Sequence, residues 1–278
     1  MVRPPPFFDH LLALPMPLLV GFLLLYWGLL AVAVHRVFVP WIAGPTGQKL
    51  GRLEAEVPAQ IGLAFGLLIS FIAIPVWDQH NHAEEVARTE AASYRDMLET
   101  IESSAEPGTE PLIPALRKAV GFLVATEWPQ MARLQSPRIA APPLRELRSA
   151  IHSLPEGGLR HELDDLFRQA AASRETRLRI AASRPPPARW SIVGVLGILT
   201  LLGVGLIHAE SYRARRIALA MVAIGITCCF VILLAYTRPY LGQFAIQPID
   251  LIVLSEEGAG ADAIDGIASL PGAISIPR

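Results

Sequence analysis

The chain has 278 residues, of which 52% are hydrophobic and 18% charged, with a mean hydropathy of +0.41. This composition is too apolar for two ordinary soluble domains and too poor in charge for a disordered protein. The formal net charge of -1 gives no general electrostatic attraction to nucleic acid. Cys228 and Cys229 are adjacent and therefore cannot link distant segments. We expect a polytopic protein whose first partner is the lipid bilayer, without a nucleic-acid partner.

Four apolar stretches approach or exceed the roughly 20 residues that cross a bilayer as a helix. They cover residues 18–34, 57–77, 190–207 and 217–236. The first stretch exceeds the apolar core of a secretory signal, so we expect it to remain as a span. No span has Asp, Glu or Lys at its centre, which disfavours a charge-translocating pump. His35 and Arg36 follow the first stretch and are interpreted as anchors at the membrane surface.

The sidedness of the spans stays open because two counts of basic residues disagree. The short loops, residues 35–56 and 208–216, are rich in Arg and Lys, which predicts that they lie in the cytoplasm and the termini outside. The end of the long loop, residues 174–189, is also rich in Arg and predicts the reverse.

The long loop, residues 78–189, has helical apolar spacing throughout and no strand signal. Its first helix, residues 78–101, continues from the second span, and three more helices are predicted near residues 114–127, 144–154 and 159–182. Pro129 is expected to end or kink the helix near residues 114–127. The predicted fold is all-α, with four transmembrane helices and a helical extramembrane domain inserted between the second and third spans. The predicted parts are the N-terminal segment 1–17, helix pair 18–77, helical domain 78–189, helix pair 190–236 and segment 237–278.

The C-terminal segment is expected to contain a short extended stretch at residues 243–254 and a mobile tail after it.

Charge is distributed unevenly along the helical domain. Residues 78–110 have a net charge of -7, and residues 111–189 have a net charge of +6. We expect acids near residues 78–85 to lie level with the arginines of 177–184 on the returning helix. The alternative is that both faces are solvated without specific partners.

The second span has two kinds of face. Small residues recur every four positions and permit close helix contact: Gly62, Gly66 and Ser70. Large apolar residues fall mainly on other faces and are the candidates to line a pore: Phe65, Leu68 and Ile72. If copies of this helix surrounded an axis, such side chains would form a constriction that closes by dewetting. The alternative is a face against lipid or core, with no pore.

A group of residues after the second span mixes metal-ligand types: Asp78, His80, His82, Glu84 and Glu85. Helical spacing would let the pairs Asp78 and His82, His80 and Glu84, or His82 and Glu85 share a cation. A solvated helix exit explains the same residues, and we predict neither a metal site nor a cofactor. The sequence has no phosphate-binding glycine loop, no HExxH helix and no nucleophile elbow, so we do not expect an enzyme.

Several short motifs stand out along the chain: residues 62–71, 76–78, 89–91, 127–131, 173–178 and 237–242. With these motifs, residues 57 to about 247 resemble a bacterial membrane family defined by a bestrophin-like domain. The residues that match the family motifs are Glu127, Trp128, Arg174, Arg177, Arg238 and Pro239. The chain departs from the family pattern at Tyr236 and Thr237, where an acidic-hydrophobic pair is frequent, and at Tyr240, where Phe is favoured.

Bestrophins are oligomeric ion channels with four spans per subunit, a pore lined by the second span and a helical cytosolic portion. The resemblance implies a homo-oligomeric channel for small inorganic ions in the bacterial inner membrane, with its neck at the three pore candidates. The acidic helix after the second span is a departure, because it would favour cations whereas many bestrophins conduct anions. The alternative function is a membrane-tethered interaction or sensing module without a conduction path.

Overall fold

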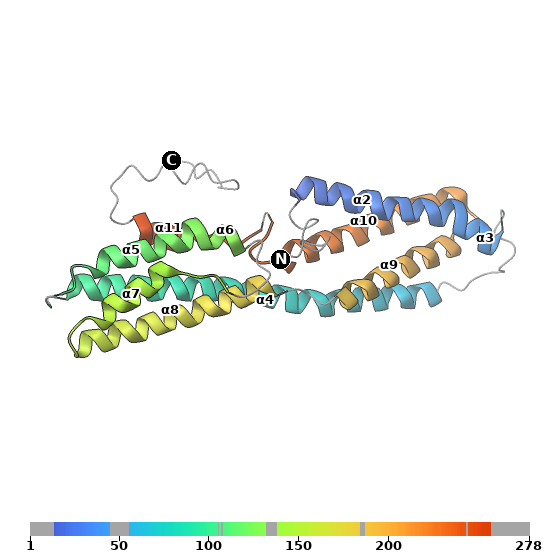
Figure 1. The fold of residues 1–278 in the computed structure, drawn as a ribbon. Helices are drawn as coiled ribbons and strands as arrows, with labels where there is room; N and C mark the ends of the chain where they lie inside the picture. Colours follow the sequence, from blue (N-terminus) through green and yellow to red (C-terminus); the bar gives the residue numbers. More distant parts are fainter. Residues whose placement is uncertain are drawn as a thin grey trace. The chain divides into compact units, whose positions relative to one another are not determined.

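A computed structural model of the chain describes residues 14–44, 56–104, 106, 108–131, 138–183, 187–242 and 244–256. Within these residues every regular element is helical and none is a strand (Figure 1), which confirms the all-α prediction. The predicted tail after residue 256 lies outside the described part. The chain forms two compact units. Unit 1 comprises residues 1–78 and 184–238, and unit 2 comprises residues 79–183 and 239–278.

Unit 1 is built from apolar helices. They are α2 (Met16–Ala33) with a π-helical turn (Val34–Phe38) and α3 (Val39–Ala43), the first part of α4 (Glu56–Ser103), α9 (Pro187–Ile207) and α10 (Tyr212–Thr237). Four of the helical stretches in the described chain are long and apolar enough to cross a membrane. They contain the four stretches predicted from the sequence.

The helix α9 packs closely against its neighbours through glycines. A Cβ atom at Gly203 would lie 2.8 Å from Cβ of Pro58 on α4, and a Cβ at Gly197 would lie 2.8 Å from the ring of Trp27 on α2. Neither distance is compatible with a side chain. Apolar helices in lipid gain little from burying apolar area, so this close backbone approach is what brings them into van der Waals contact.

The helix α4 is continuous over 48 residues, with Pro75 inside it. At 1.5 Å per residue it is about 70 Å long, more than twice the roughly 30 Å hydrocarbon core of a bilayer. The prediction that the second span and the first helix of the long loop form one helix is confirmed.

Unit 2 is a helical bundle with its own core. It contains the second part of α4, then α5 (Leu112–Phe122) with a π-helical turn (Leu123–Glu127) and α6 (Trp128–Met131), α7 (Pro142–His152), α8 (Gly158–Ala182) and α11 (Ile249–Glu256). All of these helices except α6 contribute buried apolar side chains to one cluster, including Met97, Leu116, Leu147, Leu163 and Leu251. Met131 of α6 belongs to a second, smaller cluster. The helix does not end at Pro129. It continues to Met131 after the widened π-helical turn, which accommodates the missing N–H of proline.

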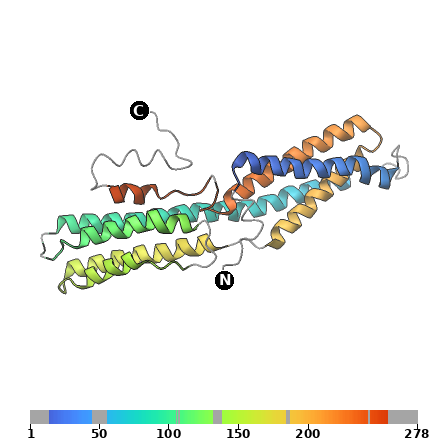
Figure 2. The same ribbon diagram turned by 45° about the horizontal axis from the view of Figure 1, so that its top comes forward.

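The prediction of an extended stretch at residues 243–254 is wrong from Ile249 onward, where α11 begins. Proline is well tolerated at a helix start, and the carbonyl of Pro248 accepts from the Ile252 amide at 2.9 Å. Leu251 and Leu254, three residues apart, are both buried in the core of unit 2. Figure 2 shows α11 alongside α5, the helix that it contacts. Burial of these two leucines against the rest of unit 2 stabilises α11. The sequence of so short a segment does not show that this packing exists.

We predict that Gly203→Ala destabilises unit 1 by about 1–3 kcal/mol, because the new methyl group overlaps Pro58 and forces α9 and α4 apart. The measurement is the midpoint of thermal unfolding of the purified protein in detergent. Gly194→Ala is the matched control on the same helix, since its Cβ would have no atom within 4 Å. Equal midpoints for the two variants would contradict the packing role of Gly203.

Candidate functional site

Four charged side chains meet inside unit 2, and all four lie in the short motifs that carry the family resemblance. Arg177 donates from Nε to Oε2 of Glu90 at 2.5 Å and from Nη2 to Oε1 of Glu90 at 2.9 Å. The same Nη2 donates to Oε1 of Glu127 at 2.7 Å. Arg174 donates through Nε to both carboxylate oxygens of Glu127, at 3.1 and 2.9 Å. We call these four residues the charge cluster.

The charge cluster is shielded from solvent. The side chains of Glu90, Glu127 and Arg177 are 0% exposed, and that of Arg174 is 17% exposed. Two carboxylates and two guanidiniums neutralise each other, which is what permits this burial. Burial raises the pKa of Glu90, although Arg177 opposes the rise. Burial by itself lowers the pKa of Arg177, but Glu90 and Glu127 outweigh it and hold that pKa above its ordinary value.

Local features of three elements bring these charges together. Arg174 and Arg177 are three residues apart on α8 and therefore share a face. Glu127 is the last residue of the π-helical turn, a rare widening that often marks functional sites in proteins. Glu90 lies on the buried face of α4, four residues before the buried Tyr94. The cluster thereby joins α4, α8 and the end of the α5 segment.

Arg177 makes two further contacts that fix its position. Its Nη1 lies 2.8 Å from Sδ of Met131, and its guanidinium carbon lies 4.7 Å from the ring centre of Trp128. An arginine over an aromatic face is held by a cation–π attraction in addition to its hydrogen bonds. The planar guanidinium thus contacts two carboxylates, a thioether and an indole, and has no contact with solvent.

Trp128 and Tyr240 connect the cluster to the chain segment after α10. Nε1 of Trp128 donates to the carbonyl of Ile246 at 3.0 Å, and the hydroxyl of Tyr240 donates to the carbonyl of Ala83 at 3.0 Å. The two rings are perpendicular, with centroids 5.7 Å apart. The amide of Ile246 also donates to the carbonyl of Pro239 at 2.8 Å. Pro239, a family-motif residue, and Tyr240, where the family favours Phe, therefore hold the segment after α10 against Trp128 and α4.

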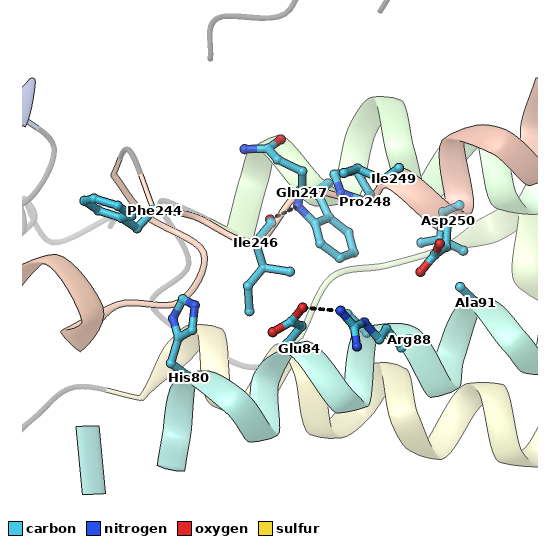
Figure 3. Close-up of a pocket in the computed structure, with 13 residues that line it drawn as sticks. His80, Glu84, Arg88, Ala91, Phe244, Ile246, Gln247, Pro248, Ile249 and Asp250 are labelled. Carbon is cyan, nitrogen blue, oxygen red and sulfur yellow. Dashed lines mark hydrogen bonds and ion pairs between the residues drawn. The ribbon is translucent and has the colours of Figure 1, made fainter. Parts of the chain in front are cut away.

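A cavity of about 350 Å³ lies next to this loop in unit 2. Figure 3 shows His80, Glu84 and Arg88 rising from α4, with residues 244–250 lying across from them. Glu84 accepts from Nη2 of Arg88 at 2.5 Å, so these two opposite charges pair on one helix. The carboxylate of Asp250 points into the same space. The lining is both polar and apolar.

The pore candidates lie in the unit 1 part of α4 and differ in exposure. Phe65 and Ile72 are both 8% exposed and pack inside the unit, and Leu68 is half-buried. Ring atoms of Phe65 lie 3.5 Å from where a Cβ on Gly197 would stand.

The predicted small-residue face of α4 is on the more open side of the unit. Gly66 and Ser70 are exposed and Gly62 is partly exposed. A Cβ at Gly62 or Gly66 would meet no other atom within 4 Å. The Ser70 hydroxyl donates to the carbonyl of Gly66 at 3.0 Å, so its polar group is satisfied within the helix.

Among the described residues, no group of three or more His, Cys, Asp and Glu side chains gathers as a metal site would require. Of the pairs considered as metal ligands near the start of the long loop, His82 and Glu85 approach within 3.8 Å on the exposed surface of α4. Arg238, the remaining family-motif residue, ends α10 in unit 1 and is 4% exposed.

A family model described as a bestrophin-like domain matches residues 25–251. The chain belongs to the bestrophin-like family. Its fold is similar to that of a crystallised, mutated bacterial bestrophin homologue from Klebsiella pneumoniae, with a TM-score of 0.65 and 14% sequence identity. That likeness covers 85% of this chain and 98% of the homologue. No curated protein matches the chain.

The sequence analysis of this bestrophin-like chain selected Glu127, Arg174 and Arg177 as site residues. It placed Glu90 in a family motif but did not select it as their partner. It expected the acids at residues 78–85 to lie level with Arg177, and the antiparallel register is close to that, because Gln79 donates to the Ser183 hydroxyl at 2.8 Å. The acid that pairs with Arg177 is nevertheless Glu90, further along α4. A signal was present: Glu90 is an acid at a position whose spacing places it on the apolar face of the helix.

We predict that Arg177→Met destabilises unit 2 by about 3–5 kcal/mol, because Glu90 is left as a buried carboxylate without its guanidinium partner. The measurement is thermal unfolding in detergent together with protease sensitivity of the α8 region. Arg179→Met is the control, since Arg179 is exposed on the same helix and contacts Thr176. The cluster would not be essential to stability if both variants unfolded at the same temperature.

Proposed function

We propose that this bestrophin-like chain is the subunit of a homo-oligomeric ion channel in which the apolar part of α4 lines the conduction path. In this proposal the four apolar helices of unit 1 cross the bacterial inner membrane. Unit 2 is then a helical domain outside the lipid, formed by the insertion between the second and third spans together with α11, which follows the fourth span. Family membership and the bestrophin fold support this arrangement.

The observation that carries the proposal is how little of α4 is covered by its own chain. In the most apolar stretch of α4, 17% of the residues are buried, against 28–39% in the other three candidate spans. Leu63, Leu67 and Phe71 are 65%, 53% and 71% exposed. These residues recur every four positions and form a stripe that copies of α4 around an axis would direct inward. The exposed small residues on the same helix would let such copies approach closely.

The exposure of the apolar side chains of α4 changes which of them we assign to the constriction. Phe65 and Ile72 are occupied by packing within unit 1, whereas Leu68 stands at the edge of the open side. We assign the constriction to Leu67 and Phe71, with Leu68 beside them. Rings of such side chains exclude water from a narrow pore and so hold it closed without any charged gate.

We predict that Leu67→Ala and Phe71→Ala each raise the single-channel conductance of protein reconstituted in planar bilayers, because each widens an apolar constriction. Leu68→Ala should have a smaller effect in the same direction. Val195→Ala is the control, since Val195 is 54% exposed but lies on α9. A well-folded oligomer that stayed electrically silent would count against the channel.

We predict that the channel prefers cations, because exposed acids Glu85, Asp96 and Glu99 follow the pore segment on the same helix. Replacing these three residues by Gln or Asn should shift the reversal potential in a salt gradient toward that of anions. Glu162→Gln with Glu175→Gln is the control, since both acids are exposed on α8. A reversal potential that the α4 variants leave unchanged would assign selectivity elsewhere.

The second candidate function is a membrane-tethered sensing or interaction module. It is favoured by the cavity between α4 and residues 244–251, whose mixed lining suits a small polar ligand. The two functions differ in assembly, because a conduction path on α4 needs several copies and a tether does not. Light scattering in detergent separates them, since a monomeric particle is compatible with the tether alone.

A further inference from the structure

A second cavity, of about 360 Å³, lies between α2 and α10 in unit 1. Four of its lining residues are polar or charged and lie where the first span ends and α10 begins: His35, Arg36, Tyr212 and Arg216. Farther along the two helices the lining is apolar and built of small or aliphatic residues, such as Gly28, Val32 and Ala220. The cavity therefore has a cationic end and an apolar end.

His35 presents an unsatisfied hydrogen-bond donor at this site. Its side chain is buried, with the residue 6% exposed, and its Nδ1 accepts from Nε of Arg215 at 3.0 Å. An imidazole whose Nδ1 accepts carries its proton on Nε2. That Nε2 is buried and has no hydrogen-bond partner among the described residues. The described residues thus leave one buried donor unpaired near the cationic end of the cavity.

The charge around His35 points to an anion. Arg36 and Arg216 line the cavity and are exposed, and neither has an ion-pair partner among the residues that the structure describes. No Asp or Glu lines the cavity. Two guanidiniums together match the several oxygens of a phosphate, which arginine binds through paired hydrogen bonds.

The helix context identifies the source of the phosphate. Both α2 and α10 are long and apolar enough to span a membrane, and their outer side chains are exposed and apolar. Tyr212, whose ring lies 4.4 Å from that of His35, is the kind of residue that sits at the headgroup level. A free anion would leave the apolar end of the cavity empty, whereas an acyl chain fills it.

We propose that the groove between α2 and α10 binds an anionic phospholipid. The phosphate accepts from the guanidiniums of Arg36 and Arg216, and one acyl chain lies along Gly28, Val32 and Ala220. This inference rests on the membrane location in the proposed function, but not on conduction. If the protein bound lipid but carried no current, the lipid proposal would stand and the channel proposal would fail. If it carried current but bound no lipid, the reverse would hold.

The test is native mass spectrometry of the full chain in detergent, titrated with phosphatidylglycerol or with phosphatidylcholine. We expect phosphatidylglycerol to bind preferentially. The double variant Arg36→Gln with Arg216→Gln should weaken its binding about 10-fold or more, because two charge-assisted hydrogen bonds are lost. Arg213→Gln is the control, since Arg213 is exposed at the same end of α10 but does not line the groove.

A second variant tests the apolar end independently of the charges. A Cβ at Gly28 meets no atom within 4 Å, so Gly28→Leu should fold and block the acyl chain. Gly21→Leu is its control, because Gly21 is equally open but lies outside the lining. Equal binding of the two lipids, or binding unaffected by both test variants, would overturn the proposal. Displacement of phosphatidylglycerol by millimolar inorganic phosphate would also overturn it, because the site would then serve a free anion.

Discussion

The fold of unit 2 depends on the placement of one guanidinium between two carboxylates. Arg177 has no contact with water, and its charge is compatible with burial only because Glu90 and Glu127 approach it from two other elements. This requirement fixes how α4 and α8 are rotated about their axes and positioned along them, and it also fixes the end of the α5 segment. A shift of any of these elements would separate the charges. Trp128 covers the guanidinium and also bonds Ile246, so the same point holds the segment after α10.

Unit 1 is held together by close helix packing at glycines, since its apolar helices offer few charged groups to pair. Helices that are apolar on every side gain little specificity from burying more apolar area in lipid, and buried ion pairs are costly there. The contacts of Gly197 and Gly203 with side chains of α2 and α4 instead specify shape, because no other residue fits at those positions. The two units thus illustrate two ways of selecting one packing arrangement: opposite charges in a polar bundle and missing side chains in an apolar one.

The helices were predictable because their apolar residues repeat at helical spacing over many turns. The helix predicted at residues 159–182 is α8, Gly158–Ala182. The prediction failed where a segment is short and its partner is distant, as at α11, whose helical state depends on burying Leu251 and Leu254 against other helices. For the site, the family motifs contain Arg174, Arg177 and Glu90, yet the pairing of Glu90 with Arg177 depends on the register between two helices, which spacing within one helix does not determine. The exposure of Leu67 and Phe71 likewise follows from which sides of α4 the neighbouring helices cover.

His35 shows the same limit from the opposite direction. A histidine followed by an arginine at the end of an apolar stretch is typical of a surface anchor, and Arg36 is exposed as that interpretation requires. His35 is buried instead, because the π-helical turn Val34–Phe38 turns its ring toward α10, where Arg215 meets Nδ1. An anchor needs no defined tautomer. Arg215 instead fixes the tautomer of the imidazole and leaves its buried Nε2–H without a partner among the described residues, and an unpaired buried donor costs about 1–3 kcal/mol.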